Sequence, residues 1–214
     1  MVDGRVRPKG GETVPESTKT QSDQLEERNA QILKVATRIF ARKGFRNTDV
    51  QDIADEAGVG KGTVYRHFGA KKELFLAAVD KGTRDLTETI LERTASCTDP
   101  MEFLQVGLRE YFKFFDKNQD LVEIFIQERS EFRGESKATY FTYRDNNISV
   151  VEETLKRGME MGAFRPINVK RTAEIICDLA YGTVIAGLMK GDREKLVSRT
   201  EDILKVYLDG IRNQ

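Results

Sequence analysis

Residues 46–72, RNTDVQDIADEAGVGKGTVYRHFGAKK, decide the fold, because they contain two short helical patterns separated by a glycine. Thr48 is placed to cap the first helix, since its hydroxyl can accept a hydrogen bond from a free backbone N–H. Gly58 can adopt the left-handed conformation that commonly ends a helix. Between them, apolar residues follow the i, i+3, i+4, i+7 spacing of a helix with one buried face: Val50, Ile53, Ala54 and Ala57. The stretch therefore predicts a helix, a tight turn and a second helix.

The second helix is expected to begin after Gly60 and to present two different faces. At 100° per residue, Val64 and Phe68 point toward the core. The opposite face is small, basic and rich in hydrogen-bond donors: Gly62, Thr63 and Arg66, flanked by Lys61, Tyr65 and His67. The major groove of DNA admits a helix, and such side chains contact bases and phosphates, so this face predicts DNA binding. The alternative is a solvated helix pair in an all-α protein, because the same geometry also serves plain packing.

The longer segment 32–79, ILKVATRIFARKGFRNTDVQDIADEAGVGKGTVYRHFGAKKELFLAAV, resembles the N-terminal domain of the tetracycline-repressor (TetR/AcrR) family of bacterial transcriptional regulators. The blocks FARKGF, DIADEAGV, KGTVYRHF and KKEL occur in the family's order and spacing. The resemblance implies an all-α fold: a three-helix helix-turn-helix domain followed by a helical domain for ligand binding and dimerisation. Family members usually carry Ser where Gly60 and Ala70 stand, so two cap hydroxyls are missing here.

The same resemblance implies which residues contact DNA bases or phosphates. Arg66 is less uniform in the family, and its assignment rests on its place on the exposed face of the second helix. The residues carried over by position are Thr48, Lys61, Gly62, Thr63, Tyr65, His67 and Lys71.

Composition limits the other functions open to this chain. Its 214 residues carry 35 basic and 35 acidic side chains, so any affinity for DNA must come from a local patch. Cys97 and Cys177 lack the CxxC spacing of a zinc site and form no disulfide framework, which favours a reducing cytoplasm. No run approaches the roughly 18 apolar residues of a membrane span. We therefore expect no metal, no cofactor and no membrane partner.

The chain divides into a disordered tail (1–22), the helix-turn-helix domain (23–70) and a C-terminal effector-binding and dimerisation domain (71–214). A helix is expected from Asp23 to Lys43, and a long one from Lys71 to about Ser96. The side chain of Ala70 has no oxygen to cap the helix that starts at Lys71. The free backbone N–H groups of its first turn could therefore bind an external anion such as a DNA phosphate. The alternative is that Glu73 and solvent satisfy these N–H groups. Gly82 inside it is either a flexible point or a site of close helix packing.

Most aromatic residues lie in the middle third of the chain. Aromatic side chains at helical spacing usually belong to the core, but a pocket between helices would use the same residues. The resemblance implies that the effector site lies in this part of the protein. The candidate pocket residues are Phe103, Tyr111, Phe115, Phe125, Glu128, Phe132 and Phe141.

The last third predicts three helices, of which the final two are candidates for dimerisation. One runs from about Ser149 to Met161. A second, capped by Asn168 and ended by Gly191, is apolar on more than one face. The last is amphipathic and begins near Thr200. Packed against their symmetry mates, the final two would form a four-helix interface, unless a monomer buries them internally. The candidate interface residues are Leu179, Gly182, Ala186, Ile203 and Tyr207.

These features predict a cytoplasmic, homodimeric, ligand-responsive repressor that binds a palindromic DNA operator and an unknown small-molecule effector. One alternative is an effector-independent activator or architectural DNA-binding protein, which a fully packed C-terminal domain would favour. A small helical enzyme is a further alternative. It is disfavoured because the single histidine, His67, lies on the second helix with no cysteine or second histidine near it.

Overall fold

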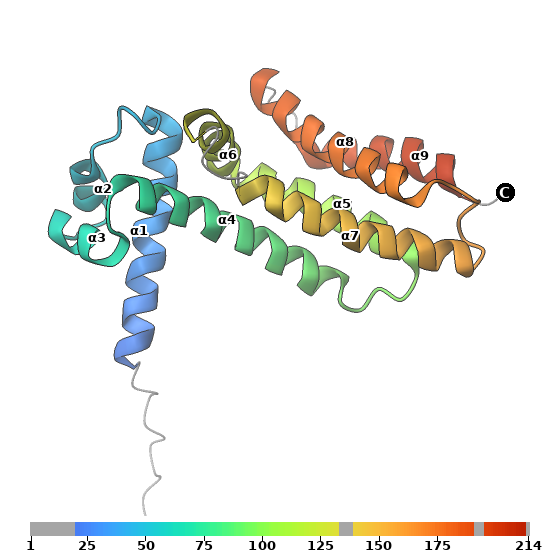
Figure 1. The fold of residues 1–214 in the computed structure, drawn as a ribbon, viewed down its shortest axis with the longest axis horizontal. Helices are drawn as coiled ribbons and strands as arrows, with labels where there is room; N and C mark the ends of the chain where they lie inside the picture. Colours follow the sequence, from blue (N-terminus) through green and yellow to red (C-terminus); the bar gives the residue numbers. More distant parts are fainter. Residues whose placement is uncertain (1–19, 133–138, 191–194, 213–214) are drawn as a thin grey trace, which may run out of the picture.

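The structure is a computed structural model that describes residues 20–132, 139–190 and 195–212, and within these ranges it is all-α, as predicted. Figure 1 shows an elongated molecule with α1, α2 and α3 at one end and the remaining helices in a bundle that extends away from them. The predicted tail at residues 1–22 lies mainly outside the described residues. The helices, in chain order, are α1 (Gln21–Lys43), α2 (Val50–Glu56), α3 (Lys61–Phe68), α4 (Lys71–Thr94), α5 (Pro100–Lys117), α6 (Gln119–Glu131), α7 (Thr139–Glu160), α8 (Val169–Lys190), the 3-10 helix η1 (Leu196–Arg199) and α9 (Thr200–Ile211).

Helix α1 begins two residues before the predicted Asp23, because Thr20 and Asp23 form a reciprocal capping box. It ends at Lys43 as predicted, and Gly44 follows it with a φ of 80°. The side chains of Ile32, Ile39 and other apolar residues on one face of α1 are buried against the neighbouring helices. Helix α1 therefore supports the α2–α3 pair.

The α2–α3 pair has the predicted helices and turn but a different first cap. Asp49 is the N-cap of α2, and its carboxylate accepts a hydrogen bond from the N–H of Gln51 at 2.8 Å. The expectation that Thr48 caps this helix is wrong, because its buried hydroxyl donates to the carbonyl oxygen of Gly44 at 2.8 Å. Gly58 has a φ of 68°, as its predicted role at the end of the helix requires.

Helix α4 belongs to both halves of the molecule. Its first turns pack on α1, where the rings of Phe75 and Phe40 meet edge to face at 5.0 Å. Its later turns pack on α5 and α7. A Cβ atom at Gly82 would lie 2.4 Å from a methyl carbon of Leu121 at the start of α6. Close packing with α6 therefore explains the glycine within α4.

Helix α7 begins at Thr139, ten residues before the predicted start at Ser149. The carboxylate of Glu128, on α6, accepts hydrogen bonds from the N–H and the hydroxyl of Thr139 at 2.9 and 2.7 Å. A cap eleven residues upstream lies beyond the local spacing from which the start was predicted. The expected end is confirmed, since Gly162 follows with a φ of 73°.

Helix α8 is capped as predicted, because the side-chain oxygen of Asn168 accepts a hydrogen bond from the N–H of Arg171 at 3.0 Å. Its predicted end at Gly191 lies outside the described residues. The segment Val169–Met189 has a mean hydropathy of 1.4. Judged by length and composition only, it could cross a membrane. The segment contains no unbroken apolar run of that length, because polar residues are interspersed in it, but its average hydropathy is high. Only 22% of the apolar window is buried, so much of α8 has no cover from its own chain.

Candidate DNA-binding surface and ligand cavity

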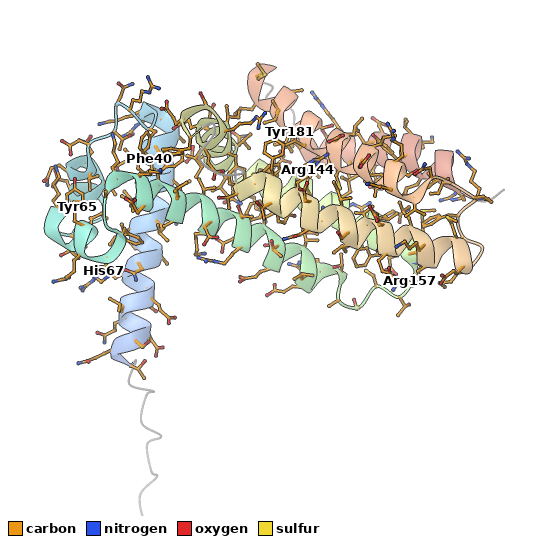
Figure 2. The ribbon with its side chains drawn as sticks, viewed as in Figure 1. Phe40, Tyr65, His67, Arg144, Arg157 and Tyr181 are labelled. Atoms are coloured by element: carbon orange, nitrogen blue, oxygen red, sulfur yellow. The ribbon has the colours of Figure 1, made fainter. Side chains whose placement is uncertain are left out.

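Helix α3 presents its polar face at the end of the molecule farthest from α8 and α9. Figure 2 shows Tyr65 and His67 projecting from this helix. The side chain of Tyr65 is 43% exposed, and Arg66 is exposed beside it. A Cβ atom at Gly62 would meet no other atom within 4 Å, so the chain's own packing does not require a glycine there. We call the following set the reading face: Lys61, Gly62, Thr63, Tyr65, Arg66 and His67.

Lys61 is held by an acidic residue outside the reading face. Its Nζ atom donates a hydrogen bond to the carboxylate of Asp49 at 2.9 Å. This bond raises the pKa of Lys61, while the backbone N–H of Gln51 and then Lys61 lower the pKa of Asp49. Both groups therefore stay charged at neutral pH, and a phosphate would have to replace Asp49 as the partner of Lys61.

Lys71, a candidate phosphate contact, instead binds the loop between α1 and α2. Its Nζ atom donates to the carbonyl oxygens of Arg46 and Thr48 at 3.1 and 3.0 Å. It also lies 4.8 Å from the centroid of the Phe45 ring. The candidate DNA contacts Thr48 and Lys71 therefore lie next to each other. The hydrogen bond between them, from Nζ of Lys71 to the carbonyl oxygen of Thr48, holds the loop between α1 and α2 in place. A DNA contact from either residue stays a prediction.

The start of α4 has no side-chain cap, as expected from Ala70. Its neighbour Lys72 lies 5.2 Å from the centroid of the Phe132 ring. The helix therefore begins in basic surroundings beside α3, with backbone N–H groups that no side chain of the N-cap residue satisfies.

A cluster that we call the α6 junction joins the helix-turn-helix to the bundle. The side chain of Gln127, on α6, accepts a hydrogen bond from the N–H of Phe45 at 2.9 Å and donates one to the carbonyl oxygen of Phe40 at 3.0 Å. Nearby, Arg46 pairs with Glu131 at 2.8 Å, which raises the pKa of Arg46. Sequence reasoning missed Gln127, because its partners lie more than 80 positions away and no local pattern marks it.

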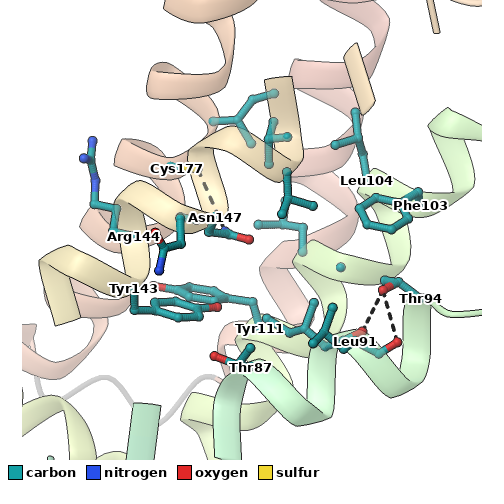
Figure 3. A pocket seen from close by; sticks show the side chains of 18 of the residues that line it. Thr87, Leu91, Thr94, Phe103, Leu104, Tyr111, Tyr143, Arg144, Asn147 and Cys177 are labelled. Carbon is teal, nitrogen blue, oxygen red and sulfur yellow. Dashed lines mark hydrogen bonds between the residues drawn. The ribbon is translucent and has the colours of Figure 1, made fainter. Parts of the chain in front are cut away.

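The bundle contains a cavity of about 270 Å³ between α4, α5, α7 and α8 (Figure 3). Two of the seven candidate pocket residues, Phe103 and Tyr111, line it. The other five do not line this cavity, and each has a contact elsewhere that accounts for it. The rings of Phe115 and Phe125 pack in the buried core, Glu128 caps α7, Phe132 packs on Phe45 in the α6 junction, and Phe141 lies under Arg129.

One end of the cavity carries three tyrosine hydroxyls, of which only that of Tyr111 belongs to a candidate pocket residue predicted from the sequence. The hydroxyls of Tyr111 and Tyr140 share a hydrogen bond of 2.6 Å, and Tyr143 lies beside them. Burial raises the pKa of all three phenols, so they stay neutral. Asn147, also on α7, lies 4.0 Å from the Sγ atom of Cys177 on α8.

Seven residues of α7 line the cavity. Two of them, Arg144 and Asn146, lie at the edge of this helix face, and the other five follow a helical stripe: Tyr140, Tyr143, Asn147, Val150 and Val151. This spacing was visible in the sequence and would have indicated a lining face, had α7 been expected to start at Thr139. Within the described part of the chain, no group of three or more His, Cys, Asp or Glu side chains could hold a metal ion.

Comparisons with known proteins agree with this architecture. Residues 32–78 match the family described as bacterial regulatory proteins, tetR family, and residues 97–184 match the tetracyclin repressor-like C-terminal domain. The chain is 30% identical over 167 residues to the HTH-type transcriptional repressor KstR2 of Mycobacterium tuberculosis, covering 75% of this chain and 82% of that protein.

Two solved structures share the fold. The fatty acid degradation regulator FadR from Bacillus halodurans superposes with a TM-score of 0.74 at 21% identity, covering 86% of this chain and 99% of that one. FadR from Bacillus subtilis, in complex with stearoyl-CoA, has a TM-score of 0.72 at 20% identity, with coverage of 86% and 99%.

Proposed function

This chain belongs to the tetR family of bacterial regulatory proteins, and we propose that it represses transcription as a homodimer that leaves its operator when a small molecule fills the cavity. The observation that carries the proposal is the exposed reading face. It is basic, it lies at one end of the molecule, and its glycine has open space before it. These properties suit insertion of α3 into a major groove.

Dimerisation is supported by apolar side chains that the chain leaves exposed on its last helices. Ile175 and Leu179 on α8 are 49% and 40% exposed, and Val206 on α9 is 77% exposed. Gly182 has nothing within 4 Å of an added Cβ atom, so a second helix could approach closely there. A symmetric partner would cover these residues and place two reading faces on one side of a duplex, about 34–36 Å apart.

Helix α4 provides a direct route from the cavity to the reading face. Its residues Thr87, Ile90, Leu91 and Thr94 line the cavity, while Lys71 at its other end holds the loop that precedes α2. A ligand that prefers one position of α4 would shift the separation of the two α3 helices. Its effect is limited by its difference in affinity for the two states.

An aromatic-lined cavity favours the sensor over an effector-independent activator or architectural protein, for which a fully packed bundle is expected. The B. subtilis FadR structure with stearoyl-CoA supports a ligand site in this fold, and the name of KstR2 supports repression.

The proposal is tested by selecting genomic fragments with the purified protein at low salt and footprinting those that bind. We expect protection of a palindromic site by two chains. The Arg66→Ala variant should lose about 1–3 kcal/mol of discrimination at one base position of each half-site. Failure to enrich any duplex from the native genome would overturn the proposal.

A further inference from the structure

The cavity wall formed by α4 and α5 is apolar and offers a ligand no free donor from its threonines. Leu91, Phe103 and Leu104 present hydrocarbon surface. The hydroxyl of Thr87 donates to the carbonyl oxygen of Thr83 at 2.9 Å, and that of Thr94 donates to Ile90 at 2.8 Å. These threonines therefore present methyl groups, and this wall binds by apolar contact alone.

The cavity also lacks a positive charge that is free to bind an anion. Arg144 is the one charged residue among the described residues that line it, and its guanidinium pairs with Asp178 and, at 3.5 Å, with Asp145. Figure 3 shows this guanidinium directed away from the tyrosine rings. An anion in the cavity would meet a guanidinium whose positive charge two carboxylates already balance, and an uncompensated buried charge is costly.

The tyrosine end can donate hydrogen bonds. Tyr111 and Tyr140 have two hydroxyl protons, and the bond between them uses one. Within the described residues, neither the second proton nor the hydroxyl of Tyr143 has a recorded acceptor. Because burial keeps these phenols neutral, they can serve as hydrogen-bond donors to a ligand oxygen at physiological pH.

We infer that the cavity takes a small uncharged apolar molecule with one accepting oxygen, a carbonyl, ether or hydroxyl, placed against the hydroxyls of Tyr111, Tyr140 and Tyr143. This inference rests on the proposed function in one respect: it takes the cavity to be the site where the effector of the repressor binds. The volume of about 270 Å³ lies just below the usual range of ligand pockets, roughly 300–1,000 Å³, which favours a small molecule. A free carboxylate of the same skeleton is disfavoured, because Arg144, the charged residue of the lining, is already balanced by Asp178 and Asp145.

Cys177 provides a readout that does not involve DNA. It lines the cavity, and Cys97 is the only other cysteine of the chain, so the Cys97→Ser variant leaves a single thiol. Alkylation by iodoacetamide at about pH 9, followed by mass spectrometry, then reports access to the cavity. The two probes are 2-decanone and decanoate, which share one chain length and differ in charge.

We expect 2-decanone at roughly ten times its dissociation constant to slow alkylation about ten-fold. Decanoate at the same concentration should slow it less than about two-fold, because its charge is not compensated. Tyr140→Phe should raise the 2-decanone concentration needed for half protection by about two- to ten-fold, the worth of one hydrogen bond. Ser149→Ala is the control without effect, since it removes an exposed hydroxyl from the same helix, α7, outside the cavity.

Thermal melting shows whether each variant folds. If the Tyr140→Phe variant does not fold, Tyr111→Phe or Tyr143→Phe is used in its place. Equal or better protection by decanoate, or none by 2-decanone, overturns the inference. DNA binding without any probe is measured separately. A chain that binds no duplex but passes the alkylation test would refute the proposed repressor function while leaving the ligand class intact.

Discussion

At the scale of single residues, Lys71 shows how a side chain suited to DNA can be engaged by its own chain. Two of its three N–H groups donate to carbonyl oxygens of the loop that precedes α2. The family resemblance implies a DNA contact from Lys71, which stays a prediction, and no sequence pattern revealed the two carbonyl partners. Thr48 is similar, because its hydroxyl serves the turn after α1 and not the cap of α2.

Replacing Lys71 by Ala should therefore affect both stability and DNA binding. We expect a loss of about 1 kcal/mol in the free energy of unfolding, measured with urea, because two loop carbonyls lose their donor. Affinity for all duplexes should fall alike, and log K should become less steep in log salt by about one unit. An unchanged salt slope would restrict Lys71 to holding the loop.

Gly62→Ala should have opposite effects on stability and on DNA binding. The added methyl group meets no atom of the protein, so the folded state should gain up to about 1 kcal/mol from helix propensity. The same methyl group projects from the reading face and should weaken operator binding. Urea denaturation and a gel-shift titration check the two effects, and undiminished affinity would contradict close approach of DNA at this glycine.

Cys177 should make stability depend on alkaline pH. Burial is the main cause that raises the pKa of its thiol from 9.0 to about 11. Between these values the unfolded chain loses the proton and the folded chain keeps it, so this contribution is complete below pH 9 and is lost as pH rises through 11. The melting temperature of the wild-type chain should fall more over this window than that of Cys177→Ala. Parallel curves would contradict the assignment.

At the scale of elements, helices whose signals are local could be predicted, and those that depend on distant partners could not. Helices α3 and α4 start as predicted, after Gly60 and at Lys71. Helix α7 does not start as predicted, because its cap is Glu128 on another helix. That error hid the lining face of α7, and so Phe115 and Phe125 were assigned to the pocket in place of Tyr140 and Tyr143.

Gly82→Ala should destabilise the contact between α4 and α6. Helix propensity favours Ala by about 1 kcal/mol, but the overpacking against Leu121 costs about 1–3 kcal/mol. We expect a net loss of about 1 kcal/mol in urea denaturation. Combining the change with Leu121→Ala should recover the overpacking part, so additive losses in the double variant would contradict direct contact.

Gln127→Ala should weaken the α6 junction, because the N–H of Phe45 loses its acceptor and the carbonyl of Phe40 keeps only the N–H of Gly44. We expect a loss of about 1–3 kcal/mol of stability. Effector-induced release of DNA should also become smaller. Gln127→Glu is the matched comparison, since it keeps the acceptor for Phe45 and replaces the donor to Phe40 with a charged oxygen. Full retention of effector response in both variants would remove the junction from the coupling route.

At the scale of the whole molecule, the exposed apolar faces of α8 and α9 predict an obligatory partner. Leu179→Arg should give a monomer by analytical ultracentrifugation and a large loss of operator affinity, because each chain then presents one reading face. Met161→Arg is the control, since Met161 is 62% exposed at the turn after α7. A dimeric Leu179→Arg chain with normal affinity would contradict the proposed interface.

The 24 residues of α4 form a rod of about 36 Å, and Leu121 packs directly against its single interior glycine. A rod of this length that tilts by about 5° at the cavity end displaces its far end by roughly 3 Å. In a symmetric pair both rods swing, so the distance between the two reading helices changes by up to about 6 Å, a sizeable fraction of one duplex repeat. A bound molecule that tilts α4 by a few degrees would therefore change the spacing of the two heads relative to successive grooves.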